Sequence, residues 1–166
     1  MYIKIGQIIN THGHRGELKV YPLSDHPQRF YELDHVYIKR NDEYKAYHVH
    51  SVRLHQNVVI MALAGIPDMN EAEKMKGLYL ELPAGELKPL PPGHYYHFQI
   101  VGLEVYEGEY YLGKVEEILE TGSNDVYVVK KGQEKPIYLP ALKEVIKKID
   151  LDRGKMEVRI PPGLLE

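Results

Sequence analysis

Apolar residues recur at every second position along most of this chain, and this alternation constrains the fold more than any other feature. In the clearest run, Met156, Val158 and Ile160 alternate with charged residues. A period of two is typical of β-strands with one buried face, whereas an amphipathic helix shows a period near 3.6. The pattern therefore predicts an all-β fold with only a few short helices.

A hairpin is predicted near the beginning of the chain. Two apolar strand patterns are separated by the sequence THGHRG, in which Gly13 and Gly16 stand close together. Because glycine adopts positive φ at little steric cost, this spacing predicts a tight reversal. The loop would present His12 and Arg15 to solvent, where binding groups are commonly placed. A hairpin whose polar residues are only solvated is the alternative.

Residues 1–83 are predicted to form the first of two small domains. They contain six strand patterns, and Asp68 with Glu71 matches the capping box of a helix over Met69 to Lys76. Six short strands are enough to close a small antiparallel barrel, which removes exposed strand edges.

The sequence 84–94 separates the two halves of the chain. Its three prolines and two glycines predict a stiff linker, with an ordered loop packed on either barrel as the alternative. Residues 95–166 carry turn signals about every eight to twelve residues, which is typical of a second small β-barrel. We therefore expect two β-barrels joined by a proline-rich linker.

Charge and composition limit the functions open to the chain. Its net charge is −3: ten basic residues balance ten acidic ones over residues 1–83, and eleven face fourteen over residues 84–166. Nucleic-acid binders usually carry a basic excess, so the mildly acidic second half fits a basic protein partner better. The absence of cysteine excludes disulfides and thiolate chemistry. Without a signal sequence or a long apolar run, we expect a cytoplasmic monomer with no membrane association.

Motifs for catalysis are missing from the sequence. It has no G-x-S-x-G elbow, P-loop lysine or dinucleotide fingerprint, so we expect a protein that is not an enzyme and needs no cofactor. His48 and His50 would share one strand face, and with His55 they leave a metal-dependent hydrolase as an alternative. Because no H-E-x-x-H motif accompanies them, we expect solvated histidines and no metal.

Several motifs resemble those of the RimM family of bacterial ribosome maturation factors. The first half contains G-x-I-x-x-x-H-G-x-R-G-E-x-K-V-x-P, a turn of the form S-D-x-P-x-R-F, and G-I-x-D-x-x-x-A-E-x-x-K-G. The second half contains Y-Y-x-F-x-x-x-G, T-G-x-N-D-V-Y-V-V and I-P-P-G-L-L-E. The resemblance covers nearly the whole chain. It implies a translation-factor-like barrel over 1–83, a linker over 84–94 and a PRC-type barrel over 95–166.

The resemblance also implies a function. Such a factor would bind immature small ribosomal subunits, aiding rRNA processing and assembly of the head as a non-catalytic chaperone. Its partner would be small-subunit ribosomal protein nineteen, a basic head protein. The tandem aromatic associated with ribosome binding in the family corresponds to Tyr95 and Tyr96. One of them would be the anchor, since large aromatic side chains often dominate interfaces, unless both are core residues.

Basic residues of the first barrel are the candidates for contact with rRNA, namely His12, Arg15, Lys19 and Arg29. The two arginines would bind phosphate through bidentate bonds, unless intramolecular salt bridges to Glu17 or Asp25 engage them. A direct RNA-binding module dominated by the first barrel is therefore the alternative function. We expect Asn124 and Asp125, like the two loop glycines, to have a structural role in a turn.

Overall fold

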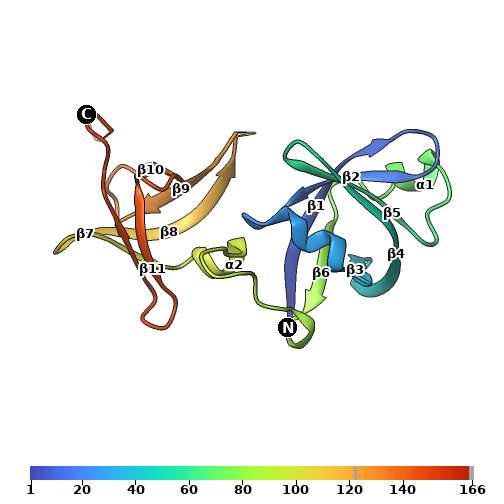
Figure 1. Cartoon of the computed structure of the whole chain (residues 1–166), viewed down its shortest axis with the longest axis horizontal. Coiled ribbons are helices and arrows are strands. Elements are labelled where there is room, and N and C mark those ends of the chain that lie inside the picture. Colours follow the sequence, from blue (N-terminus) through green and yellow to red (C-terminus); the bar gives the residue numbers. More distant parts are fainter. Residues whose placement is uncertain (122, 165–166) are drawn as a thin grey trace. The chain divides into compact units, whose positions relative to one another are not determined.

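The chain folds into two β-rich units, which confirms the expected all-β class (Figure 1). The computed structural model describes residues 1–121 and 123–164; Gly122, Leu165 and Glu166, which belong to two of the family motifs, lie outside them. The compact units are Met1–Tyr96 and His97–Glu166. The boundary follows Tyr96, so both tandem tyrosines belong to the first unit, whereas the sequence placed them at the start of the second.

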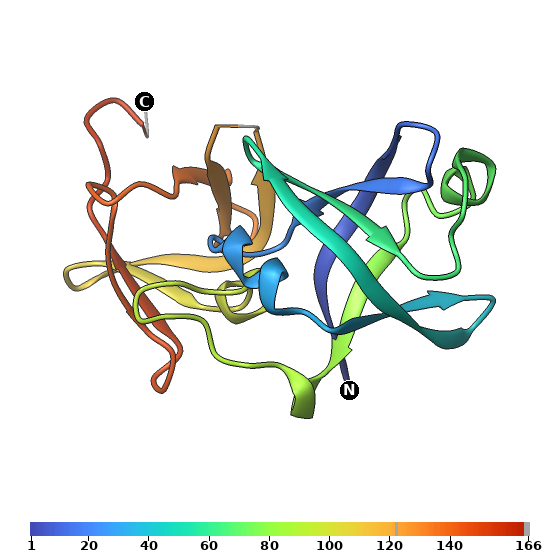
Figure 2. The same cartoon turned by 45° about the vertical axis from the view of Figure 1, so that its right-hand side comes forward.

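The first unit is a closed antiparallel barrel with the strand order β1-β2-β5-β4-β3-β6 (Figure 2). Its strands are β1 (Tyr2–His12), β2 (Glu17–Pro22), β3 (His35–Arg40), β4 (Glu43–His55), β5 (Val58–Leu63) and β6 (Tyr79–Pro83). Alternate side chains fill the interior, where Ile8, Leu18 and Val36 are fully buried. Closure leaves no strand edge of this barrel unpaired, as expected from six short strands.

Three short helical segments accompany the barrel: η1 (Pro27–Glu32), α1 (Met69–Glu73) and η2 (Ala84–Glu86). The capping box is present, because the Asp68 side chain accepts a hydrogen bond from the Glu71 N–H at 3.0 Å. However, α1 ends at Glu73 and not at Lys76. Tighter turns follow it, and they place Met75 in the core at 2% exposure. No helix in the described ranges is long or apolar enough to cross a membrane.

The proline-rich segment 84–94 packs against the first barrel. Leu87 and Leu90 lie partly buried against the barrel core. The Ala84 N–H donates to the carbonyl of Met1 at 2.8 Å, which ties the start of the segment to β1. These contacts correspond to the ordered-loop alternative.

The second unit is one six-stranded sheet with the order β10-β9-β8-β7-β12-β11. Its elements are α2 (His97–Ile100), β7 (Glu104–Glu107), β8 (Tyr110–Glu120), β9 (Asp125–Lys130), β10 (Ile137–Pro140), β11 (Ile146–Asp150) and β12 (Lys155–Val158). Among the described residues of this unit, only β7 and β12 pair in parallel. Val105, Val129 and Met156 are fully buried on its inner face. Within the described residues β10 and β11 remain edges, so this unit is a half-barrel.

Candidate partner-binding surface

The tandem tyrosines are joined to the turn that follows β2. Ser24 and Tyr96 form an isolated antiparallel bridge. The Tyr95 N–H donates to Asp25 Oδ1 at 2.8 Å, and the Asp25 N–H donates to the Tyr95 carbonyl at 3.2 Å. The structure therefore unites the S-D-x-P-x-R-F turn with the tyrosine motif. Sequence reasoning did not include Asp25 among the binding residues, although its motif contains it.

Tyr96 is a core residue of the first barrel. Only 4% of it is exposed, and its hydroxyl donates to the Lys88 carbonyl at 2.9 Å. Burial raises the pKa of Tyr96, and the nearby Arg29 guanidinium partly opposes this rise. A partner cannot reach this ring while the barrel is intact.

Tyr95 lies half-buried at the surface of the same unit. Beside it, His94 Nδ1 is 3.3 Å from Asp25 Oδ1, and the rings of His26 and His94 lie 4.9 Å apart. One carboxylate oxygen thus contacts both the His94 ring and the Tyr95 backbone. Of the two tandem tyrosines, only Tyr95 is placed to contact a partner from the surface.

Arg29 supports this surface from within. Its Nε donates to Glu32 Oε2 at 3.1 Å, and its Nη1 donates to the Lys88 carbonyl at 2.9 Å. Its side chain is 13% exposed. The intramolecular salt bridge considered from the sequence is present, but its acidic partner is Glu32 and neither Glu17 nor Asp25.

The loop between β1 and β2 presents the other predicted basic residues. Gly13 and Gly16 have φ of +75° and +81°, and both His12 and Arg15 are exposed. Glu17 pairs with Arg53 at 3.2 Å, and Arg15 forms no ion pair among the described residues. Lys19 lies half-buried on β2. Arg15 is therefore the arginine of the predicted pair that remains accessible to phosphate.

The predicted turn in the second unit makes mainly local contacts. The Thr121 hydroxyl donates to the backbone carbonyl of Asn124 at 2.5 Å, and the side-chain amide of Asn124 donates to the backbone carbonyl of Asp125 at 3.2 Å. Asp125 Oδ2 also lies 2.9 Å from His97 Nε2, at the start of α2. Asp125 thereby connects this turn to the first helix of the second unit.

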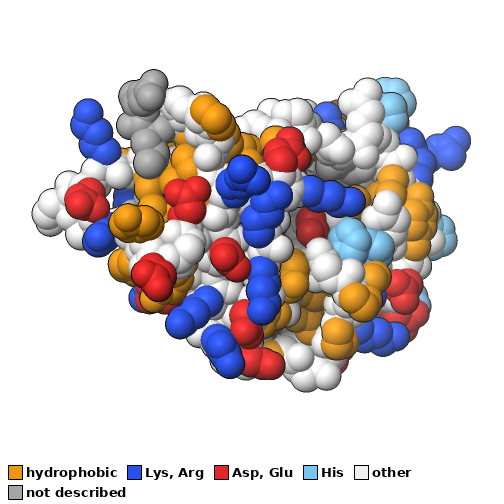
Figure 3. All heavy atoms as spheres, turned by 60° about the vertical axis from the view of Figure 1, so that its left-hand side comes forward, with side chains coloured by type: hydrophobic (Ala, Val, Ile, Leu, Met, Phe, Trp, Pro, Cys, Tyr) orange, Lys and Arg blue, Asp and Glu red, His pale blue; other side chains and the backbone are white. Residues whose placement is uncertain are grey.

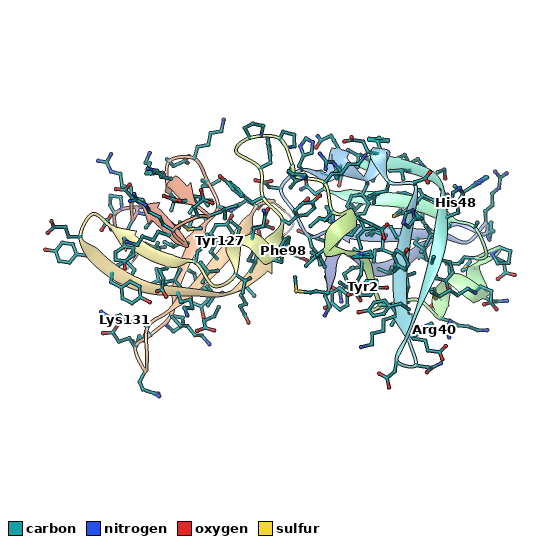
Figure 4. All side chains as sticks on the ribbon, turned by 90° about the horizontal axis from the view of Figure 1, so that it is seen from below. Tyr2, Arg40, His48, Phe98, Tyr127 and Lys131 are labelled. Carbon is teal, nitrogen blue, oxygen red and sulfur yellow. The ribbon has the colours of Figure 1, made fainter. Side chains whose placement is uncertain are left out.

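The histidines considered for metal binding are exposed on β4. His48 and His50 stand two residues apart, with His55 at the end of the strand (His48 is labelled in Figure 4). Over residues 1–121 and 123–164, no group of three side chains has an arrangement that could hold a metal ion.

Tyr111 on β8 is expected to ionise at unusually high pH. A hydrogen bond from its hydroxyl to the Glu104 carboxylate, together with desolvation, raises its pKa from 10.0 to about 12. Because the folded pKa exceeds the unfolded one, this contact stabilises the fold fully below pH 10 and is lost as pH rises toward 12. Tyrosinate absorbance during alkaline titration should show one late-ionising group, and Glu104→Gln should lower its pKa. An unchanged titration curve in that variant would contradict the assignment.

Two family models agree with this architecture. Residues 3–87 match the RimM N-terminal domain, and residues 97–164 match the RimM PRC barrel domain. A ribosome maturation factor RimM from Desulforamulus reducens is 44% identical, with 99% of this chain and 98% of that protein covered. The RimM of Ruminiclostridium cellulolyticum is 40% identical with the same coverage. A crystal structure of a Pseudomonas aeruginosa RimM is 32% identical, covers 97% of this chain and 98% of its own, and has a TM-score of 0.49.

A closed six-stranded barrel followed by a PRC-type sheet defines a two-unit β protein of the kind found in ribosome maturation factors. The chain belongs to the RimM family.

Proposed function

We propose that this protein binds immature small ribosomal subunits and, without catalysis, assists rRNA processing and assembly of the head. Its partner there is the basic head protein, ribosomal protein nineteen of the small subunit. The observation that carries the proposal is the different exposure of the two tandem tyrosines: Tyr96 is buried in the barrel, while Tyr95 lies at the surface.

Asp25 prepares Tyr95 for binding. The Tyr95 N–H donates to the Asp25 carboxylate and the Asp25 N–H donates to the Tyr95 carbonyl, so the main chain beside the aromatic ring is already ordered before a partner binds. Preorganisation of this kind reduces the conformational entropy lost on association. A factor that binds one conformation of the maturing head better than the others shifts the particle toward that conformation.

Replacing Tyr95 with alanine should weaken binding to purified immature small subunits. Loss of a hot-spot aromatic costs about 2 kcal/mol or more, which corresponds to roughly 30-fold in affinity. Co-sedimentation with the subunits measures the effect. Tyr110→Ala is the matched control, because Tyr110 is 78% exposed at the start of β8 and lies in the other unit. Equal affinity of the folded Tyr95 variant and the wild-type protein would refute the anchor role.

The loop between β1 and β2 is the proposed site of rRNA contact in the first unit. His12 and Arg15 are exposed there, and Lys19 lies near them on β2. An arginine without an internal carboxylate partner can form bidentate bonds to a phosphate. This loop also supports the second candidate function, a direct RNA-binding module in which the first barrel supplies most of the affinity.

A further inference from the structure

The outer face of the second sheet carries basic side chains from β8, β9 and β12. Cross-strand pairing places Lys130 of β9 beside Lys114 of β8, Lys114 beside Glu104 of β7, and Glu104 beside Lys155 of β12. Directly paired residues point to the same face of a sheet. All three lysines are exposed, whereas Val105 and Met156 on the opposite face are fully buried.

Two tyrosines lie in the neighbouring row of the same face. Tyr106 of β7 pairs with Tyr111 of β8, and their ring centroids are 5.2 Å apart. Lys155 Nζ lies 5.2 Å from the Tyr106 ring centroid, and Lys131 Nζ lies 5.8 Å from that of Tyr111 (Lys131 is labelled in Figure 4). We call the surface formed by Tyr106, Tyr111, Lys114, Lys130 and Lys155 the lysine–tyrosine face.

Lysines slightly outnumber acids on this face although the second half of the chain is acidic. Lys131 and Lys148 extend it, so that five lysines stand against four acids: Glu104, Glu117, Asp150 and Glu157. Of these acids, Glu104 already accepts from the Tyr111 hydroxyl and lies 3.6 Å from Lys114 Nζ. In the space-filling view of Figure 3, acidic side chains lie among the basic ones. The average charge of the half therefore conceals an unequal distribution.

We propose that the lysine–tyrosine face binds single-stranded RNA. Lysines can neutralise phosphates while tyrosine rings stack on bases, the combination used for single strands. The small excess of lysines beside two tyrosine rings suits RNA better than a basic protein partner. The inference deepens the proposed function, because it gives the second unit its own RNA contact. It rests on that function only in taking the bound RNA to be ribosomal RNA.

The test is fluorescence anisotropy of the full chain with a labelled single-stranded oligoribonucleotide of about ten nucleotides. Between about 50 and 200 mM salt, log affinity should fall with a slope of about −0.7 per phosphate contact. Combined Lys114→Ala, Lys130→Ala and Lys155→Ala should make this slope shallower by about 2. Tyr106→Ala should weaken binding on the order of tenfold at constant salt. Tyr106→Phe keeps the ring and should retain the affinity.

Control variants separate this surface from the others. Lys143→Ala removes one exposed lysine outside the face and should leave slope and affinity unchanged. Tyr95→Ala should bind the oligonucleotide normally even if its subunit binding fails, so the two proposals can fail separately. The proposed RNA-binding role of this face is refuted if the full chain does not bind RNA, if the triple lysine variant keeps the wild-type slope, or if Arg15→Ala alone abolishes binding. Loss of a ribosomal protein contact with unchanged RNA affinity would indicate a protein-binding face and would also refute it.

Discussion

Gly16→Ala should destabilise the first barrel by about 3 kcal/mol or more. Gly16 has φ of +81°, and a Cβ built there would lie 2.4 Å from the Ile66 carbonyl oxygen and 2.9 Å from the Asp68 nitrogen. The left-handed conformation alone costs an alanine about 1–2 kcal/mol. The clash adds to this cost because both obstructing atoms are backbone, so neither can rotate away. Urea titration followed through NMR signals of the first unit measures the change.

Gly13→Ala is the matched control for this prediction. Gly13 has a similar φ of +75°, but a Cβ added there meets no atom within 4 Å. We therefore expect only the conformational cost of about 1–2 kcal/mol. If the two variants lose equal stability, the close approach of Gly16 to the segment before α1 is not what requires glycine there.

Tyr96→Ala should destabilise the first barrel by about 3–5 kcal/mol, the usual cost of emptying a large aromatic site in a core. Tyr96 is 4% exposed and packs with the barrel interior. Tyr96→Phe should cost about 1 kcal/mol or less, because the Lys88 carbonyl keeps its hydrogen bond from Arg29. The same urea titration, read on the first unit, measures both.

The Tyr96→Phe and Tyr96→Ala variants also distinguish a structural role of Tyr96 from direct contact with the partner. Tyr96→Phe should bind small subunits normally, since its ring still fills the core and Tyr95 is unchanged. A Tyr96→Ala protein that kept full stability yet lost binding would show that Tyr96 contacts the partner directly. A double alanine variant of the tandem tyrosines would not distinguish these cases, because loss of folding and loss of contact occur together.

Local sequence patterns were sufficient to predict most elements of the fold. Six strand patterns were expected over residues 1–83, and the first barrel has the six strands β1 to β6 there. The reason is that alternation of apolar residues records which face of a strand is buried. The predicted end of α1 was wrong because the turns after Glu73 tighten and bury Met75. Capping signals in the sequence do not contain this packing requirement.

The sequence by itself determined that this chain forms strands, reverses at the Gly13–Gly16 loop and resembles the RimM family. Only the tertiary structure decided which tandem tyrosine is buried, because that depends on pairing with Ser24, far away in the chain. Likewise, Lys114, Lys130 and Lys155 share a face because β9, β8, β7 and β12 are neighbours in that order in the sheet. The local pattern shows that successive side chains of a strand point to opposite faces. Long-range strand pairing determines which neighbours each side chain has and how exposed it is.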